Sequence, residues 1–240
     1  MPDVTPPPPR ALKRIGHKGA DLIAPGNTLA SFDAALAAGV DMVEFDVLRL
    51  GDGRLVLAHD LEAAQRPGVI GLEEGLDHLV TDAYAGIELD VDLKRAGYER
   101  EVLDALRERD LIGRSLISTM EEESLPVVRK LEPDVRLGWS VPKLRRNPLS
   151  NPLTKPFALL GAVEYRRRLA NRVAQRLRAG EIDAVMAHYA VVDRRLVRVV
   201  REAGGELFVW TVDDPDRIAK LERLGVTGII SNDPRLFVSA

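Results

Sequence analysis

Short apolar runs of β-type composition alternate along this chain with longer stretches whose apolar residues recur at helical spacing. The runs cover residues 12–16, 41–48, 87–93, 115–118, 136–140, 184–187, 207–211 and 228–231. The amphipathic stretches cover residues 28–38, 99–109, 120–131, 166–179, 194–203 and 215–224. These patterns predict strands and helices respectively. Capping residues support the boundaries, with Asn27 and Thr28 before the first helix and Asp214 and Pro215 before the last.

Eight strands that alternate with helices over 240 residues predict an α/β fold, a (β/α)8 TIM barrel formed by a single domain over residues 11–240. An open doubly wound sheet is the alternative, and it favours a glycine-rich turn after the first strand. The sequence HKGADLIAPGN after that strand does not match the G-x-G-x-x-G pattern. The barrel is therefore the preferred prediction.

Three segments depart from the alternating pattern. Residues 1–10 read MPDVTPPPPR and predict a disordered proline-rich tail. Residues 60–81 form a short connection with a small helix over 72–79. Residues 142–157 are rich in proline and asparagine and carry four cationic side chains, which suit either a flap beside an acidic site or a solvated surface loop. These side chains are Lys143, Arg145, Arg146 and Lys155.

The composition is that of an ordinary globular protein, with 45% hydrophobic and 30% charged residues. A net charge of −3 implies no general affinity for nucleic acid. The absence of cysteine excludes disulfides and thiolate metal sites. Neither a membrane span nor the apolar stretch of a signal peptide is found, so we expect a cytoplasmic protein without stable membrane insertion. The oligomeric state cannot be inferred from the sequence.

Polar residues cluster where a barrel of this kind places its chemistry, at the carboxyl ends of the strands. Two of them, Glu44 and Asp46, are two residues apart in an apolar run, so a strand points both carboxylates to one face. Buried together they repel each other and lose hydration, which predicts a bound divalent cation, Mg²⁺ or Ca²⁺. Asp92 is the preferred third ligand because it lies nearest its strand end, and Asp90 is second. Ion pairing within the barrel is the competing interpretation, and it is an equal alternative for Asp90 and Glu88.

His17 and His59 each end a β-type run, and imidazoles titrate near neutral pH. We expect one to act as a base or nucleophile and the other as an acid, with metal ligation as the alternative. His78 lies in a polar helix and is expected to be structural. His188 ends the sixth run, where it either contacts substrate or has a structural role at the barrel rim.

Cationic and aromatic side chains stand near the same rim. The ammonium groups of Lys18 and Lys94 suit a phosphodiester oxygen. Trp210 ends the seventh run, where its indole either packs at the barrel top or forms one wall of a substrate pocket.

These residues, taken in order, resemble the glycerophosphodiester phosphodiesterase family. That family reads His-Arg-Gly, Pro-Glu-Asn-Thr, Glu-x-Asp-Val, His-Asp, Ile-Glu-Ile-Lys and Trp-Thr-Val. Order and spacing hold from about residue 12 to the end of the chain. The matching residues here are His17-Lys18-Gly19, Pro25-Gly26-Asn27-Thr28, Glu44-Phe45-Asp46-Val47, His59-Asp60, Val91-Asp92-Leu93-Lys94 and Trp210-Thr211-Val212.

The resemblance implies a (β/α)8 barrel that cleaves a small-molecule phosphodiester with Ca²⁺ or Mg²⁺. Carried over by position, the carboxylates of Glu44, Asp46 and Asp92 hold the metal, and the two histidines form the acid–base pair. It also implies that the substrate's neighbouring hydroxyl attacks phosphorus and that water then opens a cyclic phosphate. Two lysines would contact the phosphate and the tryptophan would line the pocket; these are Lys18, Lys94 and Trp210.

Three positions depart from the family pattern: Lys18 replaces an arginine, Gly26 a glutamate and Asp92 a glutamate. The segment between His59 and the third strand is also short where family members often carry an inserted subdomain. A lysophospholipase D- or sphingomyelinase D-like barrel that takes lipids is therefore one alternative. A non-catalytic phosphate-binding barrel is the other, because the changes at Lys18 and Gly26 alter the surroundings of His17.

Overall fold

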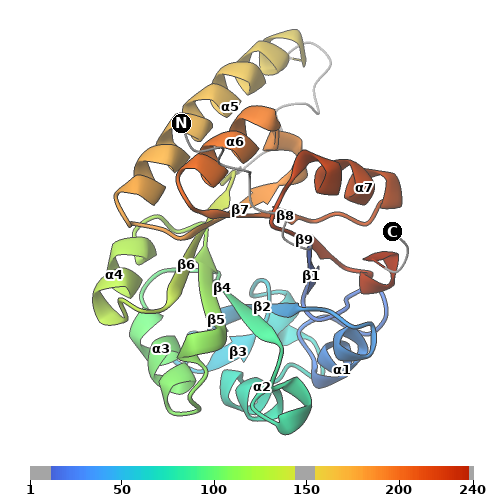
Figure 1. Ribbon diagram of the computed structural model, residues 1–240. Coiled ribbons are helices and arrows are strands. Elements are labelled where there is room, and N and C mark those ends of the chain that lie inside the picture. Colours follow the sequence, from blue (N-terminus) through green and yellow to red (C-terminus); the bar gives the residue numbers. More distant parts are fainter. Residues whose placement is uncertain (1–11, 144–154, 238–240) are drawn as a thin grey trace, which may run out of the picture.

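Eight parallel strands close into a barrel in the computed structural model, which describes residues 12–143 and 155–237 and side chains throughout except those of 155–163. The strands are β1 (Lys13–Gly16), β2 (Met42–Arg49), β4 (Glu88–Leu93), β5 (Ser115–Thr119), β6 (Arg136–Val141), β7 (Ala184–His188), β8 (Glu206–Trp210) and β9 (Gly228–Ser231). Each strand pairs with its successor, and β1 pairs with both β2 and β9, which closes the ring (Figure 1). The predicted barrel is confirmed.

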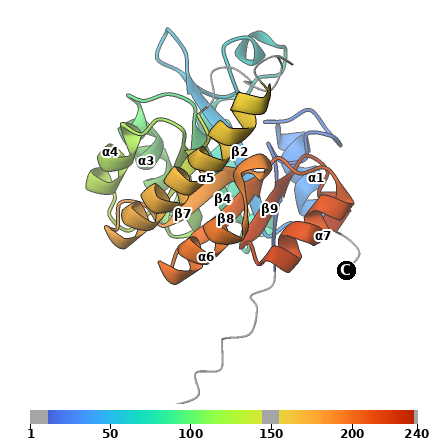
Figure 2. The same ribbon diagram turned by 90° about the horizontal axis from the view of Figure 1, so that it is seen from above.

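Seven helices of the described part of the chain surround the barrel (Figures 1 and 2). They are α1 (Leu29–Ala37), α2 (Leu72–Leu79), α3 (Glu99–Arg107), α4 (Ser124–Leu131), α5 (Lys155–Arg178), α6 (Arg194–Glu202) and α7 (Pro215–Leu224). Single 3-10 turns span Ala63–Gln65, Asp82–Tyr84, Ile112–Arg114, Tyr189–Val191 and Pro234–Phe237. Within the described ranges no helix is both long and apolar enough to cross a bilayer.

The predicted caps form at both ends of the chain. Thr28 Oγ1 accepts a hydrogen bond from the Ser31 amide, and Ser31 Oγ accepts one from the Thr28 amide, so a capping box begins α1. Asp214 accepts from the Arg217 amide at the start of α7, and Gly225 ends that helix in the left-handed region.

Two elements differ from the sequence prediction. β3 (Leu55–Leu57), the β-type run before His59, was not counted among the eight predicted strands, and it pairs antiparallel with the end of β2 as a hairpin. α5 begins at Lys155 rather than at residue 166, so the end of the predicted 142–157 loop is helical. Residues 144–154 of that loop, which include Arg145 and Arg146, and the predicted 1–10 tail lie outside the described residues, whereas Lys143 is described and pairs with Glu121.

Charged side chains from alternate strands form a layer at the amino-terminal end of the barrel. Lys13 Nζ lies 2.6 Å from Glu88 Oε1, and Arg136 Nη1 lies 3.2 Å from Glu206 Oε2. Arg136 also pairs with Glu88. Glu88 is therefore a structural ion-pair partner, which is one of the two interpretations that its sequence position allowed.

Above this layer the barrel is apolar and then becomes polar again. The apolar residues inside the ring are Ile15, Met42, Leu116, Ala184, Met186, Phe208 and Ile230. A larger cluster packs between the sheet and the surrounding helices. With one end sealed by ion pairs and apolar side chains, chemistry is confined to the opposite end, where the strands terminate.

Candidate active site

The structure brings three carboxylates together at the carboxyl end of the barrel. Asp46 of β2 is directly opposite Asp92 of β4 in the strand register, and Glu44 precedes Asp46 on the same face. One oxygen from each lies within 4.8 Å of the others, and Glu44 and Asp46 are buried. We refer to Glu44, Asp46 and Asp92 as the acidic cage.

Neighbouring groups hold the cage carboxylates in place. The Lys18 amide donates to Glu44 Oε2 at 2.7 Å. Asn27 Nδ2 donates to Asp46 Oδ2 at 2.8 Å, while Asn27 Oδ1 accepts from the Asp46 amide at 3.0 Å. Asn27 has a φ of 60°, which asparagine tolerates better than most residues. Sequence reasoning assigned Asn27 only to the helix cap and missed this contact, although its place in the Pro-Gly-Asn-Thr motif marked it.

The ammonium group of Lys94 lies inside the cage. Its Nζ is 2.5 Å from Asp46 Oδ1 and 2.6 Å from Asp92 Oδ2. Burial alone favours the neutral acid, but the charge and hydrogen bond of Lys94, together with the hydrogen bond from Asn27, outweigh it and lower the pKa of Asp46 to about 2. Burial, followed by the charge of Asp46, raises the pKa of Glu44, and burial also raises that of Asp92.

The cage fits a hard divalent cation. Asp46 Oδ1 and Asp92 Oδ1 are buried and receive no hydrogen bond, although Asp46 Oδ1 faces the Lys94 ammonium closely. Three carboxylates whose oxygens lie within 4.8 Å of one another are a donor set that Mg²⁺ and Ca²⁺ prefer. The donors present therefore match the predicted metal site in number and in chemistry.

His17 is held by a chain of polar groups from the far end of the sequence. Its Nδ1 lies 2.6 Å from Asn232 Oδ1, and Asn232 Nδ2 donates to Asp213 Oδ2 at 2.7 Å. Because the amide oxygen can only accept, Nδ1 carries the ring proton and Nε2 has the lone pair. His17 Nε2 is 3.8 Å from Glu44 Oε2, beside the cage. Burial lowers the pKa of His17.

His59 is more exposed. Its Nδ1 lies 3.2 Å from Asp60 Oδ2, and Asp60 Oδ1 accepts from the Ala63 amide at 2.8 Å. The turn after β3 thus orients the second histidine.

A pocket of about 170 Å³ opens between these groups. His17, His59, Lys94 and Trp210 line it together with two cage carboxylates. The remaining lining residues are Asp90, Ser118, Met120, Ser140, Met186, Thr211 and Ile230. Sequence reasoning did not identify the serines and methionines, because short uncharged residues inside strands carry no chemical signal of their own.

Two predicted substrate contacts are not among the lining residues. The Lys18 ammonium lies 3.4 Å from Asp21 Oδ2. His188 packs edge-on against Trp210 with 5.0 Å between ring centroids, and its Nδ1 accepts from the Ala190 amide. The Trp210 indole, in turn, donates to the Met186 carbonyl at 2.9 Å.

Asp21 also explains how the chain accommodates Gly26. Asp21 Oδ1 accepts from the Gly26 amide at 2.8 Å, and a Cβ at position 26 would lie 2.5 Å from that oxygen. No side chain fits at position 26 without moving Asp21. The carboxylate absent from position 26 thus has a local counterpart beside Lys18.

The chain matches the family model described as the glycerophosphoryl diester phosphodiesterase family over residues 17–71 and 69–236. The protein belongs to this family. Membership confirms the resemblance carried by the ordered motifs. The two matched segments meet at residues 69–71, in the shortened connection between His59 and β4.

Individual relatives agree with this assignment. A glycerophosphodiester phosphodiesterase of Caldanaerobacter subterraneus is 24% identical over 94% of this chain and 96% of that protein. A putative glycerophosphoryl diester phosphodiesterase structure from Silicibacter pomeroyi aligns with a TM-score of 0.74, at 20% identity over 95% of this chain and 92% of that chain. An Oleispira antarctica phosphodiesterase, solved with the product sn-glycerol-3-phosphate, aligns with a TM-score of 0.69, at 22% identity over 92% of this chain and 93% of that one.

Proposed function

We propose that this protein hydrolyses glycerophosphodiesters to an alcohol and glycerol 3-phosphate. His17 and His59 form the acid–base pair, and Glu44, Asp46 and Asp92 hold Mg²⁺ or Ca²⁺. The observation that carries the proposal is the meeting of both histidines and the acidic cage at one pocket, at the barrel end where such enzymes work. Family membership supports the same reaction.

In the first step the substrate's own hydroxyl, on the carbon next to the phosphate ester, attacks phosphorus. His17 Nε2 takes the hydroxyl proton, since its Nδ1 proton is committed to Asn232. The bond between phosphorus and the alcohol oxygen breaks, and His59 donates a proton to that oxygen. The products of this step are the free alcohol and a cyclic phosphodiester of glycerol.

In the second step water opens the ring. His59, now neutral, takes a proton from water as it attacks phosphorus, and His17 returns its proton to the departing hydroxyl oxygen. Glycerol 3-phosphate is released and both imidazoles recover their starting forms, so protons balance over the cycle.

Charge stabilisation comes from the cage and its neighbours. A divalent cation bound to the three carboxylates supplies positive charge beside the phosphoryl oxygens, which is usually a large contribution to catalysis. Lys94 contacts the phosphate from the same side, and Trp210 forms one wall of the pocket. The phosphate contact of Lys18 and the substrate contact of His188 stay predictions, as does the cytoplasmic location.

The test is release of glycerol 3-phosphate from a panel of glycerophosphodiesters, with Mg²⁺, Ca²⁺, Mn²⁺ or a chelator. We expect cation-dependent turnover, and His17→Asn and His59→Asn each to lower kcat by about 10²- to 10⁴-fold. His78→Asn is the matched control, because His78 pairs with Asp33 at 2.8 Å and does not line the pocket. Binding of diesters without cleavage would instead indicate the non-catalytic barrel.

A further inference from the structure

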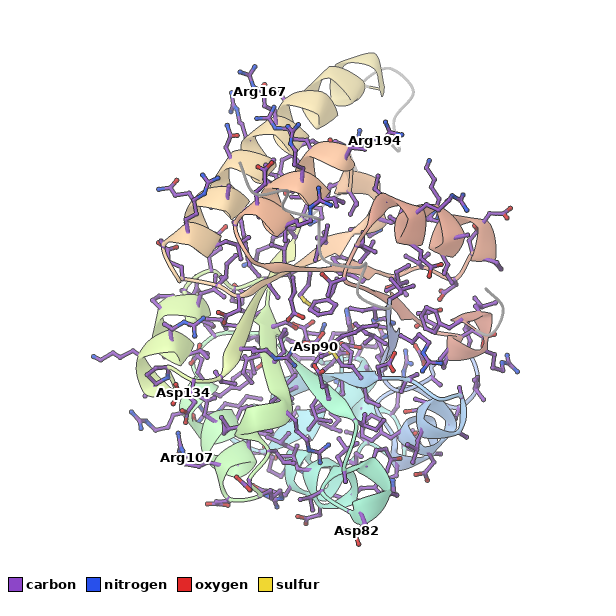
Figure 3. The ribbon with its side chains drawn as sticks, in the orientation of Figure 1. Asp82, Asp90, Arg107, Asp134, Arg167 and Arg194 are labelled. Carbon is purple, nitrogen blue, oxygen red and sulfur yellow. The ribbon has the colours of Figure 1, made fainter. Side chains whose placement is uncertain are left out.

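One carboxyl group in the pocket has no part in the chemistry proposed above. Asp90 lies on β4 two residues before Asp92, so its side chain faces the barrel interior about 6–7 Å deeper along the strand. It is 1% exposed and lines the pocket. Figure 3 shows Asp90 near the centre of the barrel, whereas the other labelled residues lie at its periphery.

Asp90 is incompletely satisfied. Asp90 Oδ1 is buried and has no hydrogen-bond partner among the described residues. Among the described residues no lysine, arginine or histidine nitrogen lies within 4.0 Å of it, unlike Glu88 below and Asp92 above, which are both ion-paired. A buried oxygen left open in this way is unfavourable unless something in the pocket donates to it.

The surroundings of this oxygen suit a small polyol. Ser118 and Ser140 add hydroxyl groups to the lining of the same pocket, and Met186 and Ile230 provide an apolar wall. Phosphate-binding groups stand at the mouth, so a phosphodiester must direct one arm inward. The pocket, at about 170 Å³, admits a glyceryl chain more readily than a long headgroup, which is left at the open mouth.

We propose that Asp90 is a specificity-determining residue that accepts a hydrogen bond from the terminal hydroxyl of the substrate's glyceryl group. This inference rests on the proposed function and names its substrate class: diesters whose glyceryl arm carries free hydroxyls. A lysophospholipid bears an acyl ester at that terminal position. It offers no donor to Asp90 Oδ1 and needs more room, so the same contact selects against lipids.

The experiment compares glycerophosphocholine with an analogue in which propane-1,2-diol replaces glycerol. The analogue keeps the hydroxyl beside the phosphate, which the reaction uses, and lacks only the terminal one. In the wild-type protein we expect kcat/KM to favour the glyceryl substrate by about 10- to 100-fold, the usual cost of leaving one buried acceptor unpaired. In Asp90→Ala the preference should fall to about threefold or less, with the loss confined to the glyceryl substrate.

Asp90→Asn retains the shape of the side chain and covers the case in which the alanine variant fails to fold. Its neutral amide should leave an intermediate preference. Asp104→Asn is the control, because this exposed carboxylate on α3 pairs with Arg107 far from the pocket and should retain the wild-type ratio. Calorimetry with glycerol 3-phosphate and with propane-1,2-diol phosphate provides a second readout that needs no turnover.

The outcomes separate the two proposals. If the wild-type protein cleaves no glycerophosphodiester, the proposed function is wrong, and the two calorimetric affinities still test Asp90. If Asp90 variants lower kcat/KM for both substrates equally, Asp90 acts only on the cage or the fold and the specificity role is wrong. Turnover of lysophosphatidylcholine as fast as glycerophosphocholine would also overturn it.

Discussion

Replacing Lys94 by methionine should destabilise the metal-free protein and strengthen its response to a divalent cation. The Lys94 side chain is 17% exposed, and its ammonium lies within 2.6 Å of two carboxylate oxygens. Among the described residues, Lys94 is the cationic side chain that balances the negative charge of the buried acidic cage. Lys94→Met retains the length and apolar stem of the side chain and removes only the charge.

The size of the effect follows from the ion pairs. Lowering the pKa of Asp46 from 3.8 to about 2 corresponds to about 2 kcal/mol of stabilisation. That stabilisation is present above about pH 4 and is lost as the pH falls through 2, so it is fully expressed at pH 7. Removing one partner of a buried pair costs about 3–5 kcal/mol. We therefore expect Lys94→Met to lower the free energy of unfolding by about 3 kcal/mol in chelator.

Denaturant unfolding at pH 7 measures this, in chelator and again with saturating Ca²⁺ or Mg²⁺. A cation at 100 times its wild-type Kd stabilises the wild type by about 2.7 kcal/mol. In the variant the cation displaces no ammonium and should bind more tightly, so at the same cation concentration the gain in stability should be larger. Lys220→Met, at an exposed position of α7, is the control and should change neither value. Wild-type stability of Lys94→Met in chelator, or an equal gain from cation in both proteins, would refute the reasoning.

Three further changes test the supports of the site and of the barrel. Asn27→Ala should weaken cation binding by about 10- to 100-fold in calorimetry, because the Asn27 hydrogen bond orients the Asp46 carboxylate toward the cation. An unchanged affinity would show that Asp46 does not need this hydrogen bond. Asn232→Leu should lower kcat more than KM, and NMR of the His17 ring should show loss of the Nδ1 proton; an unaltered ring spectrum would contradict this. Lys13→Met should lower stability by about 1–3 kcal/mol and leave kcat/KM unchanged, because it breaks only the ion-pair layer at the closed end.

Much of the barrel could be predicted because buried parallel strands appear in the sequence as nearly continuous apolar runs. Helices are recognised by the helical spacing of their apolar residues and by their capping residues. The two misses have physical causes. β3 comprises three residues, too few for any periodicity, and it forms only through antiparallel pairing with β2. The start of α5 at Lys155 follows a segment rich in proline and asparagine, which indicates a loop more strongly than the few residues after it indicate a helix.

The roles of the three acidic residues of β4 could not be predicted from the sequence. Glu88, Asp90 and Asp92 alternate with apolar residues and share one face, so spacing cannot separate them. Their depth in the barrel separates them. Glu88 pairs with Lys13 in the ion-pair layer, Asp92 belongs to the acidic cage, and Asp90 between them has an oxygen without a hydrogen-bond partner among the described residues.

By itself the sequence determined the eight-stranded pattern, the pairing of Glu44 with Asp46 on one face, and the set of polar residues at strand ends. These depend on local period and order. Only the tertiary structure decided which polar groups touch, because barrel closure joins β1 to β9 and brings Asn232 within 2.6 Å of His17 across 215 residues. The register between β2 and β4 likewise places Lys94 beside Asp46 and Asp92, and among the described residues it leaves Asp90 Oδ1 without a hydrogen-bond partner; no local pattern determines either outcome.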